Sequence, residues 1–287
     1  MSLQFDPIRH QFVADCARLW STWLQGGSSP MERQARREQA LTQAIGRTTQ
    51  FMVPPAVRFA ATGGGWASFD WTTWRLTVNH NHTRRDDIRY RNFVELCATV
   101  YHETRHAEQF YRIAQGLAAG RLKFPDASAA SDRQAMHLGP GGVAARIKAF
   151  DAVAQGQSPL GQKPAPPVSV IARRLSIPQH VVQHASTRAT YFNNYLNASR
   201  PTWFKRPTVL DEINEWMRAT GKKTYSEMDA WAQDDDSDRE RVNRMYRDLP
   251  EENDAHGIEE KVAAEIVQRI GHATDRSRRR NDLLFGP

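Results

Sequence analysis

The sequence has few of the features that mark a disulfide-stabilised, secreted or membrane protein. Its 287 residues include only two cysteines, Cys16 and Cys97, so a disulfide framework and a zinc site built from cysteines are both excluded. No apolar run approaches the roughly 18 to 20 residues that span a bilayer, and the start of the chain lacks the basic and apolar regions of a signal peptide. We therefore expect a protein without a membrane span that is cytoplasmic in the producing cell. Any export would use a route that needs no signal peptide.

The composition that is present fits a globular protein with a full-sized core. Hydrophobic residues make up 40% of the chain, enough for one large or two small domains. Lysine and arginine number 39 against 32 acidic residues, which gives a net charge of +7 and a pI of about 9.6. This excess favours contact with nucleic acid or another anionic surface without selecting either.

The spacing of apolar residues predicts a mainly helical α+β fold. Apolar positions recur every three or four residues in most of the chain, whereas β-branched and aromatic residues gather in one stretch, at about 56–79, which we interpret as a small sheet or hairpin. A long helix is expected to begin at Asp86 or Asp87 and to run to about Leu117, ending near Gly120. The other helices are predicted at 6–25, 31–46, 142–155, 169–197, 208–220, 224–233 and 251–272.

These elements suggest three parts of the chain. Residues 1–50 form an N-terminal helical segment, and residues 51–274 form the main domain, with a helical and loop insertion at about 121–200. Residues 275–287 form an arginine-rich basic tail.

The motif that points to chemistry lies inside the long helix. His102-Glu103-Thr104-Arg105-His106 is an HExxH pattern. Residues i and i+4 of a helix share a face, so both imidazoles can reach one Zn²⁺ while Glu103 polarises a metal-bound water. The spacing thus predicts His102 and His106 as zinc ligands and Glu103 as the general base.

The rest of the helix supports a functional role for this pair. The apolar residues Phe93, Cys97, Val100, Ala107 and Tyr111 form a stripe on nearly the opposite side from the two histidines. The histidine side also carries Ala98, Gln109 and Ile113, which favours a covered cleft over an exposed surface. An exposed and functionless histidine pair is the remaining alternative.

The segment upstream of this helix suggests how a substrate could be presented. If Phe69 to Val78 forms one extended strand beside the helix, a peptide backbone can pair with it by strand addition. A purely structural hairpin explains the same residues equally well.

A β hairpin, then a helix with HETRH, then a later acidic helix resembles the zincin metallopeptidases, particularly the gluzincin type. The resemblance covers about 56–117 and 246–270, and it implies a zincin-like domain that hydrolyses a peptide or protein substrate with Zn²⁺. It also implies a third zinc ligand from a Glu in an ExxA-like pattern on the later helix. The metzincin extension is absent, because Gln109 and Arg112 replace its Gly and third His. YHETRHAEQ and YRDLPEENDA are also similar to metallopeptidase domains of bacterial secreted toxins or effectors and phage-associated proteins.

The third ligand is predicted at the start of that later helix. Pro250 suits its first turn, Asp248 can cap it, and Glu251 then takes the capping-box position, which leaves Glu252 for the metal. Glu252-Asn253-Asp254-Ala255 also matches ExxA, so Glu252 is the preferred ligand. Glu251, Asp254 or a histidine are the alternatives, since the apolar stripe that follows aligns slightly better with Glu251.

Hydrolysis also needs a donor for the oxyanion that develops on the substrate. Tyr246 and His256 flank the predicted ligand and are the residues we expect for this role. Gln109, one turn after His106, either orients a ligand or lines the pocket.

A second signal points to DNA. Residues 168–190 resemble a helix-turn-helix, with Ala172 in the first helix, Ser176 where the turn usually has Gly, and Ile177 and Val182 as core positions. Arg173 and Arg174 suit DNA contact. A DNA-binding regulatory protein is therefore the alternative function, followed by a non-catalytic helical interaction protein.

Other histidines carry weaker signals. His180 and His184 form a second HxxxH pair, which lacks a following Glu and so would bind metal without supplying a base. The NHNH sequence at 79–82 and His137 are expected in loops.

Overall fold

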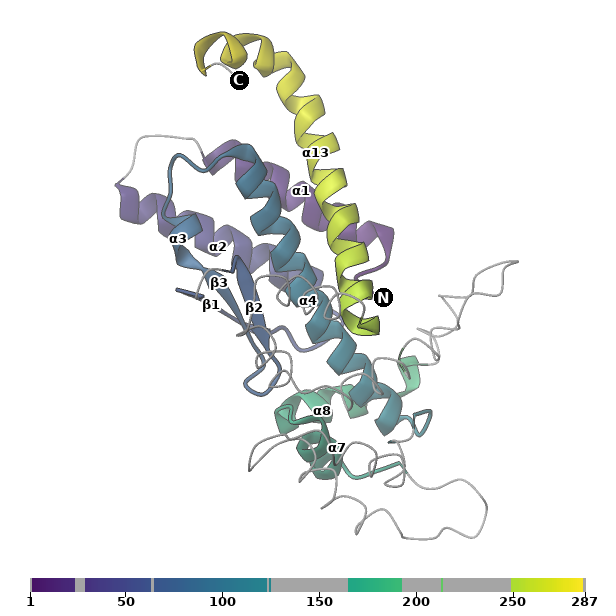
Figure 1. The fold of residues 1–287 in the computed structure, drawn as a ribbon. Helices are drawn as coiled ribbons and strands as arrows, with labels where there is room; N and C mark the ends of the chain where they lie inside the picture. Colours follow the sequence, from purple (N-terminus) through teal and green to yellow (C-terminus); the bar gives the residue numbers. More distant parts are fainter. Residues whose placement is uncertain are drawn as a thin grey trace, which may run out of the picture. The chain divides into compact units, whose positions relative to one another are not determined.

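The structure, a computed structural model, describes residues 2–23, 29–62, 65–122, 124, 165–192, 213 and 249–285, with residues 272–285 as backbone alone. It is mainly helical with one small three-stranded sheet, as the sequence predicted (Figure 1). The helices predicted at 142–155 and 224–233, almost all of 208–220, and His137 lie outside the described residues.

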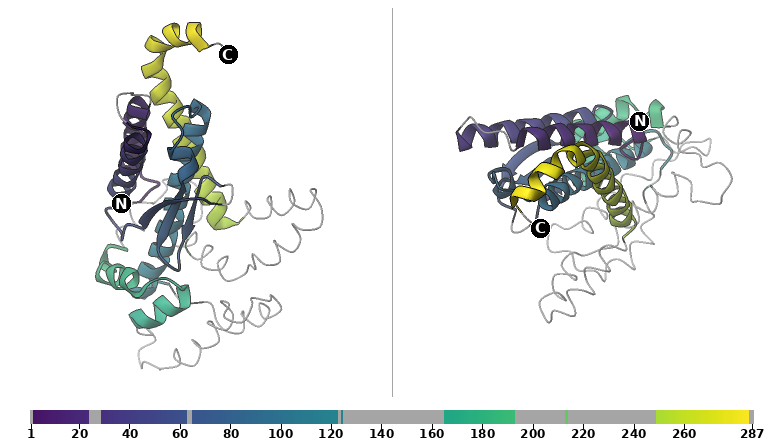
Figure 2. Two further views of the ribbon diagram at one scale, coloured as in Figure 1. Left: turned by 90° about the vertical axis from the view of Figure 1, so that its left-hand side faces the viewer. Right: turned by 90° about the horizontal axis from the view of Figure 1, so that it is seen from above.

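The two predicted N-terminal helices are confirmed as α1 (Asp6–Trp23) and α2 (Pro30–Thr48), which lie side by side (Figure 2). Ser29 and Glu32 form a capping box at the start of α2, where Pro30 opens the helix. Trp20 and Trp23 of α1 pack on Phe93 of the long helix, with ring centroids 4.8 and 5.4 Å apart. These ring contacts, with Trp23 buried, fix α1 to the helix that carries the HExxH motif.

The sheet consists of β1 (Ala56–Ala60), β2 (Ala67–Asp70) and β3 (Arg75–Asn79) in the order β1-β3-β2. β3 pairs in parallel with β1 and antiparallel with β2, so β2 is an edge strand of this sheet. The prediction of one strand from Phe69 to Val78 was wrong. Residues 71–74 form a turn, in which Trp74 has a φ of 53°, and this conformation ends the extended backbone.

The long helix is α4 (Tyr90–Ala118), preceded by the short α3 (His80–Thr83), which covers most of the NHNH segment expected as a loop. Its predicted start at Asp86 or Asp87 was wrong, because Asp86 instead binds Arg33 and Arg37 of α2. Its predicted end is confirmed. Gly120 has a φ of 67°, the left-handed conformation that closes a helix.

Three further helices are described. Residues predicted as one helix at 169–197 form α7 (Val168–Leu175) and α8 (Gln179–Thr187), separated by a turn at Ser176. The helix predicted at 251–272 is α13 (Pro250–Phe285), so the backbone of residues 275–285, expected as a tail, is helical. No helix among the described residues is long and apolar enough to cross a membrane.

The described residues fall into two compact units. The first comprises α1, α2, the three strands, α3, α4 up to His106, and α13 from Ala255 onward. The second comprises the 71–74 turn, α4 from Ala107, α7, α8 and the first turn of α13. The continuous helices α4 and α13 therefore each contribute to both.

Candidate metal centre

The two HExxH histidines lie one turn apart on α4 and face each other. Their Nε2 atoms are 3.0 Å apart and their ring centroids 4.7 Å apart. His102 is buried and His106 half-buried, and Ala98 and Ile113, which share their side of the helix, are buried as well. The prediction that this side is covered is confirmed.

Glu103 is held by the sheet. Its Oε2 accepts a hydrogen bond of 2.8 Å from the backbone N–H of Phe69 on the edge strand β2. A backbone N–H cannot rotate away, so this bond fixes the direction of the carboxylate. The sheet thus contributes to the site by orienting the HExxH glutamate, a role that the sequence did not predict.

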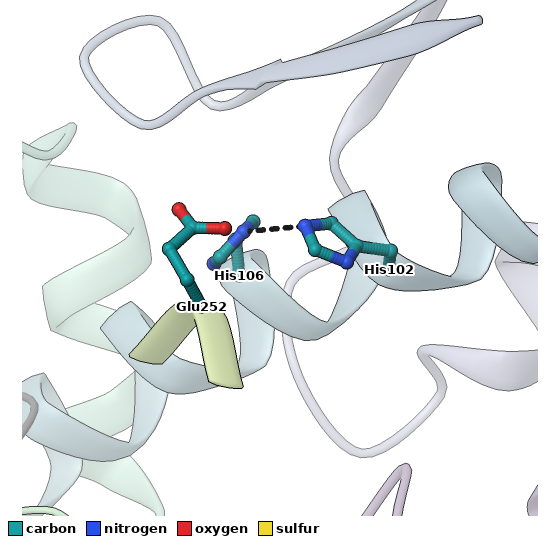
Figure 3. A group of neighbouring side chains, drawn as sticks. All are labelled: His102, His106 and Glu252. Carbon is teal, nitrogen blue, oxygen red and sulfur yellow. Dashed lines mark hydrogen bonds between the residues drawn. The ribbon is translucent and has the colours of Figure 1, made fainter. Parts of the chain in front are cut away.

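Glu252 lies in the first turn of α13, and Pro250 belongs to that turn, as predicted. Its side chain is buried, and one carboxylate oxygen lies with one nitrogen from each of His102 and His106 in a group whose donor atoms are all within 4.8 Å of one another (Figure 3). Two imidazoles and one carboxylate are a donor set that suits zinc.

A second group shares His102. Nδ1 of His102 lies 3.2 Å from Oε2 of Glu259, and Nδ1 of His256 lies 2.9 Å from the same oxygen. The hydroxyl of Thr99 donates to the other oxygen, Oε1, over 3.1 Å. His102, His256 and Glu259 also have donor atoms within 4.8 Å of one another, so the described residues contain two His/Glu groups able to hold a metal ion.

The electrostatics of Glu259 fix the orientation of His102. Burial by itself would raise the pKa of Glu259, but hydrogen bonds from His102 and His256 outweigh it and bring this pKa to about 2. An ionised carboxylate can accept a hydrogen bond but cannot donate one, so its position beside Nδ1 favours the His102 tautomer with the ring proton on that atom. Nε2, the atom that faces His106, is left with its lone pair for a metal.

The other predicted carboxylates have different roles. The side-chain amide of Gln109 donates to the backbone carbonyl of Glu251 and to the carboxylate of Asp254, both over 2.8 Å. Gln109 therefore fastens the first turn of α13 to α4. Neither Glu251 nor Asp254 belongs to a metal-capable group among the residues that the structure describes.

Of the two residues expected as oxyanion donors, only His256 lies in the described part of the chain. Tyr246 and the predicted cap Asp248 lie outside the described residues. His256 lies beside the site, with its ring centroid 4.5 Å from that of His102, and its Nδ1 is engaged by Glu259.

Sequence reasoning missed Glu259 and Thr99. Glu259 is seven residues after Glu252, so helical spacing places both on one side of α13, and this was the available signal. This signal is weak, because Glu260 follows directly and two adjacent acidic residues on a helix are usually exposed to solvent.

The second HxxxH pair is not assembled as a metal site in the described part of the chain. His180 is exposed, and Nδ1 of His184 is 3.0 Å from the hydroxyl of Tyr111. Burial lowers the pKa of His184 and raises the pKa of Tyr111, so in this contact both groups favour their neutral forms.

Comparison of the chain with protein-family models, curated proteins and solved structures found no match.

Proposed function

We propose that this protein is a zinc-dependent hydrolase, most simply a metallopeptidase, in which His102, His106 and Glu252 hold the metal. The observation that carries the proposal is the pairing of two facing imidazoles with a Glu103 carboxylate that the edge of a sheet holds in place. The same donor set also suits Fe²⁺, but Glu103 beside the histidines favours hydrolysis, since it supplies the base that a water nucleophile needs.

Zinc in this donor set would lower the pKa of a bound water toward 7 and polarise the carbonyl of a scissile amide. Glu103 would take the proton from the attacking water and pass it to the leaving amine as the amide C–N bond breaks. The bond from Phe69 would keep the Glu103 carboxylate in position during this transfer, and Glu259 would keep Nδ1 of His102 engaged so that Nε2 is available as a ligand.

The first test is metal content, measured by elemental analysis on protein purified without metal-affinity resin. We expect about one zinc per chain, lost in His102→Ala/His106→Ala and retained in His180→Ala/His184→Ala, a control pair with the same spacing. Circular dichroism checks that each variant is folded. Absence of zinc, zinc that survives the first variant, or iron in its place would each overturn the proposal.

The second test separates catalysis from metal binding. Glu103→Gln should keep zinc and the fold but lower peptide-bond cleavage by about 10²- to 10⁴-fold, because only the base is removed. Cleavage of a proteome-derived peptide mixture, followed by mass spectrometry, measures this. Equal cleavage by the variant and the native chain would show that Glu103 is not the base.

A further inference from the structure

We propose that α7 and α8 form a DNA-binding helix-turn-helix, with α8 as the helix that enters the major groove. This proposal does not depend on the metal centre. It is carried by the backbone geometry of the two helices, by their support from α4, and by the side chains and charges that they expose.

The turn between the two helices has the length and the left-handed residue that are typical of the motif. An eight-residue helix is followed by Ser176, Ile177 and Pro178 and then by a nine-residue helix. Ser176 has a φ of 55°, the left-handed conformation for which such turns usually use Gly. Its backbone N–H and that of Ile177 both bond to the carbonyl of Ala172, which closes the first helix.

The buried apolar residues of the two helices are also those expected for a helix-turn-helix. The buried apolar positions of the two helices and the turn are small or aliphatic: Val170, Ile171, Ala172, Ile177, Val181, Val182 and Ala185. Burial of these residues from both helices fixes the angle between them. The sequence-based core positions Ala172, Ile177 and Val182 are among them.

The C-terminal part of α4 supplies the third helix that such a pair needs for support. Besides the bond between Tyr111 and His184, the side-chain amide of Gln115 donates to the backbone carbonyl of Arg188 over 2.6 Å. Phe192, just after α8, is fully buried against Gly116 of α4. One edge of α8 is thus anchored.

The remaining side of α8 exposes residues with base-reading chemistry. Gln179, His180, Gln183 and Thr187 are exposed and recur at helical spacing. Glutamine can bond adenine through two atoms in the major groove, and hydroxyl groups can contact any base. These side chains lie on the helix that contacts base edges in this motif.

The charge of the segment complements a phosphate backbone. Residues 165–192 contain no Asp or Glu, although the chain has 32 acidic residues. Arg173 on α7 and Arg188 at the end of α8 are exposed. Arg174, also predicted to contact DNA, is buried with its guanidinium over the ring of Phe124. We therefore assign phosphate contact to Arg173 and Arg188 alone.

The test uses the full chain and a fluorescent mixed-sequence DNA duplex, with anisotropy measured between 50 and 200 mM salt. We expect the association constant for DNA to fall as the salt concentration rises. In Arg173→Ala/Arg188→Ala the slope of log association constant against log salt concentration should be smaller in magnitude by about two, one for each phosphate that the variant no longer neutralises. Arg84→Ala/Arg91→Ala removes the same charge elsewhere and should leave the slope within about half a unit. His102→Ala/His106→Ala should bind like the native chain, which separates this proposal from the metallopeptidase.

Sequence reading is tested by selection from a randomised duplex pool. The native chain should select a consensus, and Gln179→Ala/Gln183→Ala should lose it while keeping its affinity for mixed DNA within about twofold. No binding at 50 mM salt, an unchanged slope in Arg173→Ala/Arg188→Ala, or no consensus would overturn the proposal. Equal affinity for duplex RNA would also overturn it, because the major groove of an RNA helix does not admit α8. Replacing Arg278, Arg279 and Arg280 by Ala checks that the basic tail is not the site of binding.

Discussion

At the scale of single residues, the candidate metal centre depends on contacts made by the ring nitrogen of His102 that points away from the proposed metal position. His102 offers Nε2 toward His106 because its Nδ1 is engaged by Glu259. Glu259 lies 3.2 Å from Nδ1 of His102 and is hydrogen-bonded to His256 and Thr99, which hold it in one orientation. Such outer contacts fix the tautomer and direction of a histidine ligand before any metal arrives.

Replacing this carboxylate should weaken metal binding without removing a ligand of the proposed zinc site. We expect Glu259→Gln to lower zinc affinity by about 10- to 100-fold, because a neutral amide no longer fixes the proton on Nδ1 of His102. Competition with a chromophoric chelator measures the affinity. Glu260→Gln, an exposed neighbour on the same helix, should be unchanged. Equal zinc affinity in Glu259→Gln and the native chain would show that Glu259 does not position His102.

At the scale of elements, α4 carries the two histidines and also supports α7 and α8. The position at which α4 ends is therefore important, and a C-cap defines it. The N–H groups of Gly120 and Arg121 bond to the carbonyls of Leu117 and Gly116, the pattern of a Schellman motif. The chain then turns back and brings Leu122 over Gly116. A Cβ on Gly116 would lie 2.5 Å from Leu122 Cδ1 and 2.8 Å from Phe192 Cζ.

The same substitution should therefore have opposite effects on two helical glycines. Gly116→Ala should destabilise the fold by about 1 to 3 kcal/mol, because Leu122 and Phe192 are both buried and must move. Gly46→Ala, in α2, meets nothing within 4 Å and should stabilise the fold by about 0.5 to 1 kcal/mol through helix propensity. Urea unfolding followed by tryptophan fluorescence measures both. A stabilising Gly116→Ala would contradict the packing described for this end of α4.

At the scale of the molecule, polar contacts join segments that are far apart in the sequence. Nε of Arg9 in α1 donates to Glu265 in α13 over 2.7 Å, and the Tyr101 hydroxyl donates to the carbonyl of Leu3 over 2.7 Å. The buried Arg37 of α2 donates to the carbonyls of Trp23 and Thr83 and to Asp86. One guanidinium thus connects the end of α1, α2 and the segment before α4.

The contacts of Asp86 with Arg33 and Arg37 should make part of the free energy of unfolding depend on pH. Hydrogen bonds from Arg33 and Arg37 lower the pKa of Asp86 from 3.8 to about 2. The unfolded chain therefore binds this proton first as the pH falls, so the contribution of Asp86 is complete above about pH 4 and disappears toward pH 2. The carboxylate is 46% exposed, so solvent screening limits the contribution to about 1 kcal/mol.

Asp86→Asn should be about 1 kcal/mol less stable than the native chain at pH 7, and the difference should shrink below pH 4. Urea unfolding at several pH values measures it. Asp87→Asn is the control, because Asp87 is 78% exposed and its ion pair is with the exposed Arg85. A difference between Asp86→Asn and the native chain that grows on acidification would contradict the assigned sign.

Much of the fold could be predicted because helix and strand patterns are local. Apolar spacing located α1, α2 and α4, and Gly120 located the end of α4, since a left-handed residue closes a helix wherever it occurs. The start of α4 was misplaced. Asp86 has a side chain suited to an N-cap. In the structure its carboxylate instead pairs with Arg33 and Arg37, some fifty residues earlier in the chain.

The sequence by itself determined that His102 and His106 share one face of a helix, because four residues make about one turn in any α-helix. It also pointed to Glu252 by its place in the first turn of a later helix, and the structure brings this carboxylate into a group with the two histidines that could hold a metal ion. Only the tertiary structure decided that Phe69 holds Glu103 and that Glu259 engages His102. Those bonds join α4 to a strand and to α13, and contacts between elements so distant in the chain arise from packing, which local spacing does not specify.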